Sequence, residues 1–527
     1  MDPALAIEVA EMSKQKAMNE ALQRGDSEIQ KFYAGRVVLL TGGSGFMGKH
    51  LIEKLLRACN LKLIYILLRP KKGKSVEQRL EDVLMDPVYE NLRNRQPNFK
   101  NKLVPIVSDM TEIGLGISTE DALKLTNEVE IIIHAAATTR FDDPLKKTTL
   151  TNVRGVRDLL ALAQRCKKLI SFVYVSTAYS AATYDNINTE VSEKFYPTPI
   201  NPNTLINLAE QLNDETLENI TPGLIKRWPN TYTFSKIVAE DLIRSNAKEL
   251  PICLIRPPIV IASALEPSPG WLDKSCAFGA TGIIIGPGLG VIHAAIIDKD
   301  VKMNMMPVDM VNNSIIVAGC ETSRRWAVSD RDIKIYNISN SRNPIVSGEL
   351  SKLVKIKGQN LQTPKAIWYT YVIESKYKSV VYLLTWFLHF IPAYFVDGIL
   401  SIIGKQPMLI KIYTKAWKIN SLLSYFMINE WTFVDNNTLN LYQSLSKTDQ
   451  NIFPFDCKTL NWGDMILVWI IGIRKYIVED GLKNTDLALK KQFWFRILHY
   501  IVSAIYLYAW WKFLTFLYSI LCTVFNF

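Results

Sequence analysis

A glycine-rich turn between an apolar strand and a helix does most to limit what this chain can fold into. The segment RVVLLTGGSGFMGKHLIEKLLRAC, residues 36–59, places Gly42, Gly45 and Gly48 in the spacing G-x-x-G-x-x-G. The first glycine permits a tight turn, the second lets the backbone approach a pyrophosphate, and the third lets the helix pack closely on the strand. Because these glycines follow a strand and open a helix, they predict a dinucleotide-binding βαβ unit rather than a flexible loop.

Short apolar strands and helices continue to alternate after this unit. Further strands are expected at 61–70, 102–110, 129–137, 169–179 and 251–261, and helices at 79–92, 152–166 and 235–247. Near-continuous apolar strands that alternate with helices indicate a parallel sheet covered on both faces. We therefore predict the α/β class, with a Rossmann-type doubly wound parallel sheet and a polar excursion from it over residues 185–230.

The length of 527 residues exceeds what one compact core usually supports, so more than one domain is expected. We expect a polar N-terminal extension, an extended dinucleotide-binding catalytic domain with a substrate-binding part, a helical C-terminal domain and a hydrophobic tail. Their predicted limits are 1–34, 35–375, 376–490 and 491–527. The extension has no continuous apolar run, so it does not resemble a secretory signal and is expected to form an amphipathic or partly ordered polar helix.

Two apolar stretches of the C-terminal part suit a membrane. Residues 493–527 are apolar over most of their length, and Trp510 and Trp511 are suited to anchor them at an interface. An earlier stretch, residues 380–403, is also long enough to cross a bilayer but carries Asp397 near its end. Each stretch could instead be a buried amphipathic helix pair. The sequence leaves open whether the chain crosses the membrane once, twice or lies in the interface.

Charge and cysteine usage exclude several classes of protein. The formal charge of +11 is scattered rather than gathered in a basic tract, which argues against nucleic acid and favours phosphate-bearing cofactors or an anionic membrane surface. The seven cysteines form no C-x-x-C pair and the five histidines no ligand-spaced cluster. We therefore expect a reducing, cytosolic environment for the catalytic domain and no metal site.

The end of the second predicted strand discriminates between cofactors. NAD enzymes usually carry an Asp or Glu there for the ribose hydroxyls, whereas this strand ends in RPKKGK, residues 69–74. Cations at this position suit the 2′-phosphate of NADP, and Arg69, nearest to the strand, is the best candidate to bind it. A solvated basic loop is the alternative.

Further cofactor contacts are expected where other strands end, at the carboxyl edge of the sheet. These residues are Gly42, Gly43, Ser44, Gly45, Phe46, Met47 and Gly48 in the loop, Asp109 and Met110 after the third strand, and Ala135 and Ala136 after the fourth. Ordinary packing is the alternative for those outside the loop. His134 is expected to be a buried residue rather than an acid or base.

A tyrosine and a lysine four residues apart supply the expected acid–base chemistry. Tyr232 and Lys236 share one helix face, and the hydroxyl residues Ser176 and Thr177 end the fifth predicted strand. A free tyrosine has a pKa of about 10, and a nearby ammonium favours the phenolate and lowers that pKa. The spacing alone is common, but after a phosphate loop and a hydroxyl-bearing strand it predicts a proton donor with its tuning charge.

These motifs together resemble the extended short-chain dehydrogenase/reductase superfamily and, within it, the alcohol-forming fatty acyl-CoA reductases of the insect type. The resemblance covers about residues 30–475. It is carried, in order, by the glycine segment and by IYILLRPKKGKSVEQRL, HAAATTRFDDPL, YVSTAY, YTFSK, IRPPIVIAS, EPSPGW and MPVDMV. The family also has a C-terminal helical domain and hydrophobic segments.

The resemblance implies reduction of a long-chain or very-long-chain acyl-CoA to a primary alcohol by two NADPH, through a bound aldehyde. Tyr232 would donate a proton to the alkoxide, and Lys236 would hold the nicotinamide ribose and lower the pKa of Tyr232. Thr177 would bind the carbonyl oxygen, with Ser176 as the alternative. Pro257 and Ile259 would line the nicotinamide side. The excursion at 185–230 and the run at 276–297, expected as a buried loop and helix, would form the acyl and thioester side.

The sequence departs from the family pattern at a few positions. Ser44 replaces the commoner threonine, and Leu289 and His293 stand where the family usually has a basic residue, which puts a CoA contact there in doubt. Another membrane-bound extended dehydrogenase, acting on a hydroxysteroid or a sugar nucleotide, and a non-catalytic NADP-binding membrane protein are the alternatives. The expected partners are acyl-CoA and membrane lipid. The endoplasmic reticulum is the first choice of organelle and the peroxisome the second, while chain length and oligomeric state are left open.

Overall fold

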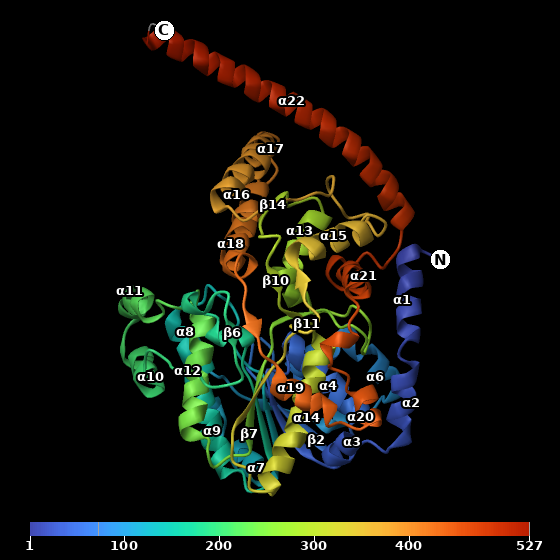
Figure 1. Cartoon of the computed structure of the whole chain (residues 1–527), viewed down its shortest axis with the longest axis vertical. Helices are drawn as coiled ribbons and strands as arrows, with labels where there is room; N and C mark the ends of the chain where they lie inside the picture. Colours follow the sequence, from blue (N-terminus) through green and yellow to red (C-terminus); the bar gives the residue numbers. More distant parts are fainter. Residues whose placement is uncertain (72, 526–527) are drawn as a thin grey trace.

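The computed structural model describes residues 1–71 and 73–525, without the side chains of Phe278 and residues 522–525. Its centre is a seven-stranded sheet in the order β12-β7-β5-β4-β1-β2-β3 (Figure 1). The strands are β1 (Val37–Thr41), β2 (Leu63–Leu68), β3 (Leu103–Val107), β4 (Ile131–His134), β5 (Ser171–Val175), β7 (Ile252–Arg256) and β12 (Lys334–Asn337). All pairings are parallel, and the strand order reverses between β1 and β4, so the predicted doubly wound fold is confirmed.

Helices cover both faces of the sheet because each strand buries alternate residues on opposite sides. In β1, Val38 and Leu40 join one core cluster, and Val37 and Leu39 join the other. The first face carries α4 (Phe46–Ala58), α5 (Val76–Leu84) and α14 (Val308–Ala327), and the second carries α7 (Thr119–Glu128), α9 (Gly155–Arg165) and α12 (Thr231–Asn246).

Prolines account for two differences from the predicted elements. The helix expected at 79–92 ends at Leu84, because Asp86 and Pro87 begin a separate 3₁₀ turn (Pro87–Tyr89) before α6 (Glu90–Arg95). The strand expected at 251–261 divides at Pro257 into β7 and β8 (Ile259–Ile261), and β8 pairs with β11 (Met305–Pro307) outside the main sheet. The seventh strand, β12, was not predicted because it has only four residues and two of them, Lys334 and Asn337, are polar.

The N-terminal extension, residues 1–34, forms three helices that pack against the rest of the molecule. They are α1 (Pro3–Ser13), α2 (Lys16–Arg24) and α3 (Glu28–Tyr33). Ala4 is fully buried in a cluster with α21 (Trp462–Gly472), and Tyr33 is fully buried under the sheet. The carboxylate of Asp2 accepts hydrogen bonds from the backbone N–H of Thr485, at 2.9 Å, and from its hydroxyl, at 2.7 Å.

The C-terminal half first leaves the catalytic part and then returns to it. A hairpin leads out through α16 (Lys378–Thr385), the π-helix η8 (Trp386–Phe390) and α17 (Ile391–Ile402), and α18 (Leu409–Met427) leads back. The chain then adds β15 (Thr432–Phe433), which pairs with β6 (Glu190–Val191), and the helices α19 (Asn436–Gln443) and α20 (Lys447–Ile452). Leu441, Ile452 and Phe453 join the core cluster of α4 and α14, so residues beyond the predicted boundary near 376 share a core with those before it.

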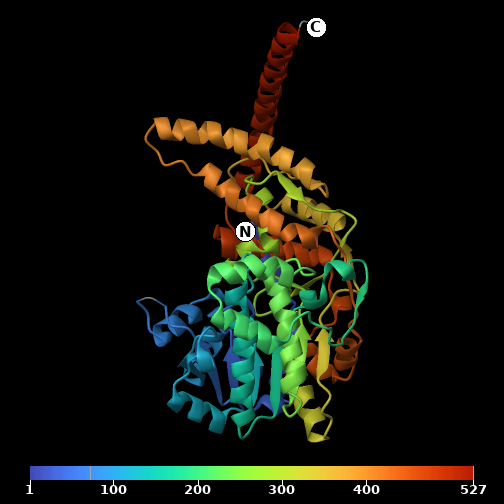
Figure 2. The ribbon, with the colours of Figure 1, turned by 90° about the vertical axis from the view of Figure 1, so that its left-hand side faces the viewer.

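Two helices of the described chain are long and apolar enough to cross a membrane. They are Lys378–Ile402, which lies in the hairpin, and Thr485–Leu521, which belongs to α22 (Thr485–Phe525). Figure 2 shows α22 projecting beyond the body of the molecule. The apolar run at 276–297 is not a candidate span, because it folds as a 3₁₀ turn, α13 (Ala280–Gly288) and β9 (Ala294–Ile296).

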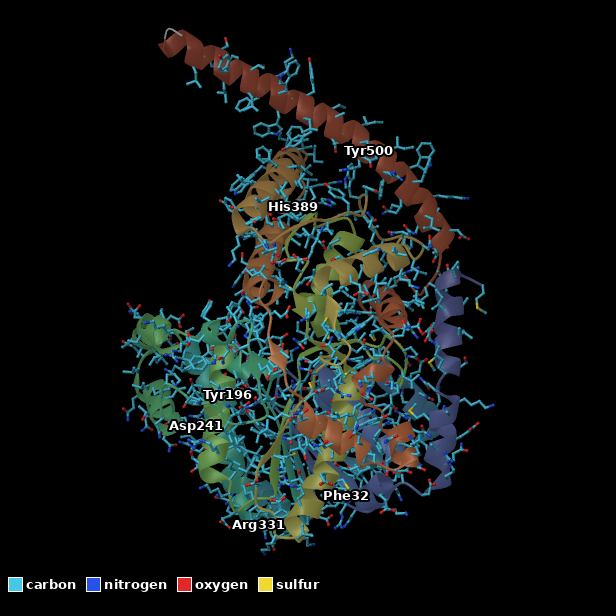
Figure 3. The ribbon with its side chains drawn as sticks, in the orientation of Figure 1. Phe32, Tyr196, Asp241, Arg331, His389 and Tyr500 are labelled. Atoms are coloured by element: carbon cyan, nitrogen blue, oxygen red, sulfur yellow. The ribbon has the colours of Figure 1, made fainter. Side chains whose placement is uncertain are left out.

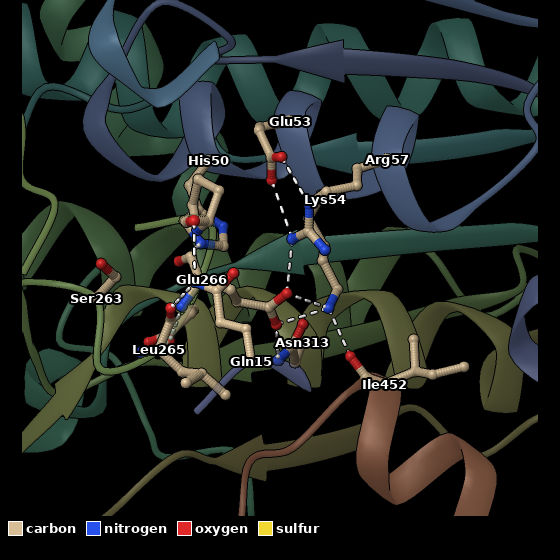
Figure 4. A network of polar contacts seen from close by, with 12 residues as sticks. Gln15, His50, Glu53, Lys54, Arg57, Ser263, Leu265, Glu266, Asn313 and Ile452 are labelled. Atoms are coloured by element: carbon tan, nitrogen blue, oxygen red, sulfur yellow. Dashed lines mark hydrogen bonds and ion pairs between the residues drawn. The ribbon is translucent and has the colours of Figure 1, made fainter. Parts of the chain in front are cut away.

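A buried network of charges joins α4 to the segment after β8 and to α20 of the C-terminal part (Figure 4). The ammonium group of Lys54 on α4 lies 2.6 and 2.7 Å from the two carboxylate oxygens of Glu266 and 2.5 Å from the carbonyl oxygen of Ile452. Arg57 donates to both Glu53 and Glu266, and none of these four charged side chains is more than 5% exposed. Burial alone would raise the pKa of Glu266, but Lys54 and Arg57 outweigh it and bring that pKa to about 2.

We expect Glu266→Gln to lower the thermal midpoint of the purified protein in detergent strongly. The substitution leaves the cations Lys54 and Arg57 without full compensation in the interior, a change that typically costs about 3–5 kcal/mol. The matched control is Glu28→Gln, which removes a carboxylate from an exposed ion pair with Lys31. Equal, small shifts of both midpoints would contradict a central role for the network.

Candidate active site

The glycine loop lies against the end of β4. Gly42 has a φ of +76°, and a Cβ atom added to it would lie 2.7 Å from the carbonyl carbon of Ala135 and from the backbone nitrogen of Ala136. A Cβ atom on Gly48 would lie 2.1 Å from the carbonyl oxygen of Gly42. Gly45 begins α4 as its N-cap. The structure therefore brings these predicted residues together in a turn that only glycine permits, with the N-terminus of α4 free to face a phosphate.

The other loop residues mainly hold the turn in place. A Cβ atom on Gly43 would lie 2.7 Å from Cγ2 of Ile66 in β2. The ring of Phe46 packs 5.3 Å from that of Trp271, and the carbonyl oxygen of Met47 accepts a hydrogen bond of 2.9 Å from Asn312 of α14. Phe46 and Met47 thus use their side chains for packing and offer a cofactor their backbone.

Two arginines meet at the carboxyl end of β2. Arg69 is 63% exposed, and its guanidinium lies 3.9 Å from the carboxylate of Asp109. Arg79, in the first turn of α5, donates to the carbonyl oxygen of Arg69 and to the hydroxyl of Ser44, the latter at 3.4 Å. This pair of cations beside the glycine loop fits a 2′-phosphate. Lys72 of the predicted basic loop lies outside the described residues.

Arg79 was missed by the sequence reasoning because it follows the basic run by several residues. A capping box, in which Ser75 and Gln78 exchange hydrogen bonds, starts α5 and turns Arg79 back toward β2. The capping motif can be recognised in the sequence, and it could have predicted that Arg79 lies in the first turn of a helix next to β2.

The third predicted strand end contributes a carboxylate and a packing residue. One oxygen of Asp109 accepts hydrogen bonds from the backbone N–H and the hydroxyl of Thr111, at 2.9 and 2.7 Å. Met110 packs on α9, where its Cε atom would lie 2.6 Å from a Cβ atom on Gly155. Asp109 therefore faces the arginine side of the cofactor groove, while Met110 mainly fills space.

The expected proton donor lies in the first turn of α12. The side chain of Asn230 caps this helix by accepting a hydrogen bond of 2.9 Å from the backbone N–H of Thr233. Burial raises the pKa of Tyr232 to about 12, and a side-chain hydrogen bond with Thr177 opposes that rise. Tyr232 therefore carries its proton at neutral pH.

Lys236 lies one turn further along α12 and is buried. Its ammonium group donates to the carbonyl oxygen of Val175, at 2.7 Å, and to the hydroxyl of Tyr174, at 3.1 Å. Burial lowers the pKa of Lys236 to about 7, although the carboxylate of Glu240 opposes this effect. The expected lowering of the Tyr232 pKa by Lys236 is not found in this state, because burial acts on both groups and Thr177 is the side chain that lowers it.

The two hydroxyl residues after β5 have different surroundings. Ser176 donates a hydrogen bond of 2.5 Å to Glu240, a buried carboxylate that also forms an ion pair of 2.5 Å with Arg256. The hydroxyl of Thr177 makes a long contact of 3.4 Å with the carbonyl oxygen of Pro257, accepts a hydrogen bond of 3.3 Å from the backbone N–H of Tyr179, and lies beside Tyr232. It has no carboxylate partner in the described part of the chain. This geometry favours Thr177 over Ser176 as the group that meets a carbonyl oxygen.

Pro257 and Ile259 lie on the same side of the sheet as Thr177. The carbonyl oxygen of Pro257 accepts a hydrogen bond of 2.8 Å from the backbone N–H of Ala178, and the backbone N–H of Ile259 donates at 3.1 Å to Asn304. These bonds hold the start of β8 next to the hydroxyl residues.

Asn152 is a further candidate for the site that the sequence reasoning missed. It is buried in a π-helical turn (Leu150–Arg154), donates to the hydroxyl of Ser235 at 2.9 Å, and exchanges hydrogen bonds with the backbone of Thr138. It thus ties the chain after β4 to the helix that carries Lys236. A π turn of this kind leaves no recognised pattern in one sequence, although such turns are frequent at functional sites.

His134 is buried and neutral, as expected. Its Nδ1 atom lies 2.6 Å from the hydroxyl of Thr41, and burial lowers its pKa to about 3. At neutral pH it is therefore not charged and serves the packing of β4 against β1.

A cavity of about 270 Å³ opens one side chain away from Tyr232. Its walls include Phe141, Asn230, Tyr425 and Lys378, the last at the base of the hairpin. The ring of Phe141 lies nearly parallel to that of Tyr232, with centroids 6.0 Å apart. The cavity thus lies between the predicted catalytic residues and the helices that lead toward the apolar segments.

The position where the family usually has a cation is occupied by an uncharged stack. The ring of His293 lies 4.2 Å from that of Tyr371, its backbone N–H donates to His389 at 2.8 Å, and burial lowers its pKa to about 4. Among the described residues, no three His, Cys, Asp or Glu side chains gather where they could hold a metal ion.

Comparison with known proteins gives matches over most of the chain. Two family models, both described as Male sterility protein, match residues 40–315 and 388–480, and the first of them is an NAD-binding model. Fatty acyl-CoA reductase wat of Drosophila melanogaster is 34% identical over 490 residues, which are 92% of this chain and 93% of that protein. Fatty acyl-CoA reductase 2 of Homo sapiens is 34% identical over 493 residues, with the same two coverages.

Solved structures support the fold. The terminal R domain from the myxalamid PKS-NRPS biosynthetic pathway superposes with a TM-score of 0.57 at 20% identity, over 89% of this chain and 99% of that one. Its identity is too low to carry more than the architecture. The sequence relationship is close enough to decide the family, and this chain belongs to the fatty acyl-CoA reductases.

Proposed function

We propose that the protein reduces a long-chain or very-long-chain fatty acyl-CoA to the primary alcohol, with two NADPH and two protons consumed and free CoA released. The observation that carries the proposal is the meeting of Tyr232, Thr177 and Lys236 beside a glycine loop with two arginines at its edge. The names of the relatives, which match over 92% of the chain, supply the substrate class.

The residues at the carboxyl edge of the sheet fit NADPH. The backbone of residues 42–48 would hold the pyrophosphate, Arg69 and Arg79 the 2′-phosphate, and Lys236 the ribose of the nicotinamide. NADPH held there supplies a hydride to the carbonyl carbon. Ala135 and Ala136 would leave room for the adenosine because they are small and already touch the loop.

The side chains of the site would polarise the carbonyl and handle the protons. Thr177 would donate its hydroxyl hydrogen to the carbonyl oxygen, where negative charge develops. After the first reduction the C–S bond breaks, CoA leaves as the thiolate and the aldehyde stays bound. After the second, Tyr232 would give its proton to the alkoxide, which its pKa of about 12 allows because the proton is present at neutral pH.

The acyl thioester would enter through the cavity beside Phe141. Lys378 at the cavity wall is the cation that would bind a CoA phosphate. It would take over the role of the basic residue that the family usually has where His293 stands here. The two apolar helices support membrane association, and we propose that α22 anchors the protein with the catalytic domain in the cytosol. The endoplasmic reticulum is the first organelle to test and the peroxisome the second.

The activity is tested with purified protein, NADPH and a series of acyl-CoA chains from C16 to C26. We expect fatty alcohol as product and expect Tyr232→Phe to lower kcat by about 10²- to 10⁴-fold, because the proton donor is lost. NADPH binding, followed by quenching of protein fluorescence, should persist in the variant. Failure to reduce any acyl-CoA, or full activity of Tyr232→Phe, would refute the proposal.

Thr177→Ala and Ser176→Ala form a matched pair of hydroxyl deletions. We expect Thr177→Ala to lower kcat by about 10²- to 10³-fold, the usual cost of removing a donor to a developing oxyanion. Ser176→Ala should instead lower the thermal midpoint, since Glu240 loses a buried hydrogen bond. The reverse assignment of the two effects would make Ser176 the carbonyl-binding group.

Arg79→Gln tests the choice of cofactor. Loss of the charged contact should raise the KM for NADPH by roughly 10- to 100-fold and leave the KM for NADH within about twofold. The control is Lys100→Gln, which neutralises an exposed cation in the turn before β3. It should change neither KM value. Equal losses with both cofactors would show that Arg79 serves the loop and not the 2′-phosphate.

A further inference from the structure

The first apolar helix of the hairpin has its polar side turned inward. A stripe of five residues at four-residue spacing is buried along α16, η8 and α17, each at most 5% exposed. These residues are Val381, Thr385, His389, Ala393 and Asp397. Three of the five carry polar groups. In an ideal helix of 3.6 residues per turn, residues spaced by four would gradually rotate away from one face. The π turn has more residues per turn and keeps the five residues closer to one face.

The outward side of the same helix is apolar and aromatic. Large side chains are exposed along its whole length, with Leu383 at 57%, Phe395 at 71% and Ile402 at 86%. A helix on a water-soluble surface has the opposite arrangement, with its apolar stripe inside and its polar residues outside. This helix is therefore suited to a surrounding that is itself apolar.

The inward polar groups all have partners within the protein. The Nε2 atom of His389 accepts a hydrogen bond of 2.8 Å from the backbone of His293. The carboxylate of Asp397 accepts from the backbone N–H groups of Met408, Leu409 and Ile410, at 3.1, 3.0 and 2.9 Å. Asp397 thereby caps α18 and closes the hairpin.

The returning helix α18 cannot share the apolar surrounding. Its exposed side carries Lys411, Thr414, Lys415 and Lys418. Lys418 forms an ion pair of 2.7 Å with Asp142 of the catalytic part, and the carbonyl oxygen of Met427 accepts a hydrogen bond from Asp298. Lysines at bilayer depth are strongly disfavoured, so α18 stays on the side of the catalytic domain.

The hairpin also contacts the tail helix α22 partway along its length. Figure 3 places His389 and Tyr500 at the same end of the chain's long axis and Arg331 at the other. The hydroxyl of Tyr506 donates at 2.9 Å to the carbonyl oxygen of Phe387, so the hairpin and α22 are in contact. In Figure 2 the α16–α17 layer runs across the long axis while α22 projects beyond it.

We propose that α16, η8 and α17 lie in the plane of a lipid bilayer, with their aromatic outer face sunk into one leaflet, and do not cross it. The apolar side then meets acyl chains, and the lysines of α18 lie toward the anionic headgroups and water. Of the two helices long enough to span, only α22 would enter the bilayer lengthwise. This inference concerns the membrane surface and does not depend on the proposed activity.

The lipid contact is tested by photo-crosslinking with the full chain in vesicles of phosphatidylcholine and phosphatidylserine. Benzoylphenylalanine replaces Phe395 in one variant and Ile113, which is 78% exposed on the catalytic part, in the control. We expect a lipid adduct from position 395 and none from position 113. A cross-link from position 395 to a second copy of the chain, or no adduct, would overturn the proposal.

The in-plane orientation is tested with a water-soluble, membrane-impermeant maleimide on sealed vesicles whose catalytic domains face outward. Gln406→Cys places a thiol in the turn between α17 and α18, and Lys100→Cys is the control on the catalytic part. Both thiols should react before detergent is added, giving one extra label relative to the parent chain. If the thiol of Gln406→Cys reacts only after detergent, the helix crosses the bilayer and the proposal is wrong.

Discussion

The ion pair between Lys54 and Glu266 joins parts of the molecule that lie far apart in the sequence. Lys54 belongs to the helix that follows the glycine loop, and Glu266 belongs to the segment after β8. The third partner is the carbonyl oxygen of Ile452, which belongs to the returning C-terminal chain and accepts a hydrogen bond from Lys54. Asn313 of α14 donates to the same carboxylate at 3.0 Å. Ions this deep are tolerated only when every partner is present, so the network requires the C-terminal helices to be docked.

The same requirement explains why the predicted catalytic and helical domains are not separate bodies. The hairpin of α16 to α18 stands apart from the sheet, but the residues after it come back to complete the core under α4 and α14. The cavity near Tyr232 is correspondingly built from both halves of the chain. A change in the C-terminal part can therefore alter the cofactor loop as well as the entrance to the site.

Much of the fold was predictable because its signals are local. The apolar runs of β1 to β5, the glycine spacing and the pair Tyr232 and Lys236 each lie within a few consecutive residues. The residues that were missed depend on distant contacts or on unusual turns, as for Asn152 in its π turn. The docking of the polar N-terminal helices was not foreseen, because the residues that receive them lie several hundred positions away. The expected lowering of the Tyr232 pKa is not found for a similar reason, because burial raises this pKa and a four-residue spacing does not reveal burial.

The carboxylate of Asp2 begins two helices at opposite ends of the chain. One of its oxygens accepts from the backbone N–H of Ala4 in α1, and the other accepts from that of Thr485 in α22, 483 positions further on. During synthesis on the ribosome, the bond between Asp2 and Thr485 cannot form until almost the entire chain has been made. The two ends of the chain therefore hold the start of α22 together, and this contact can be made only after Thr485 has been synthesised.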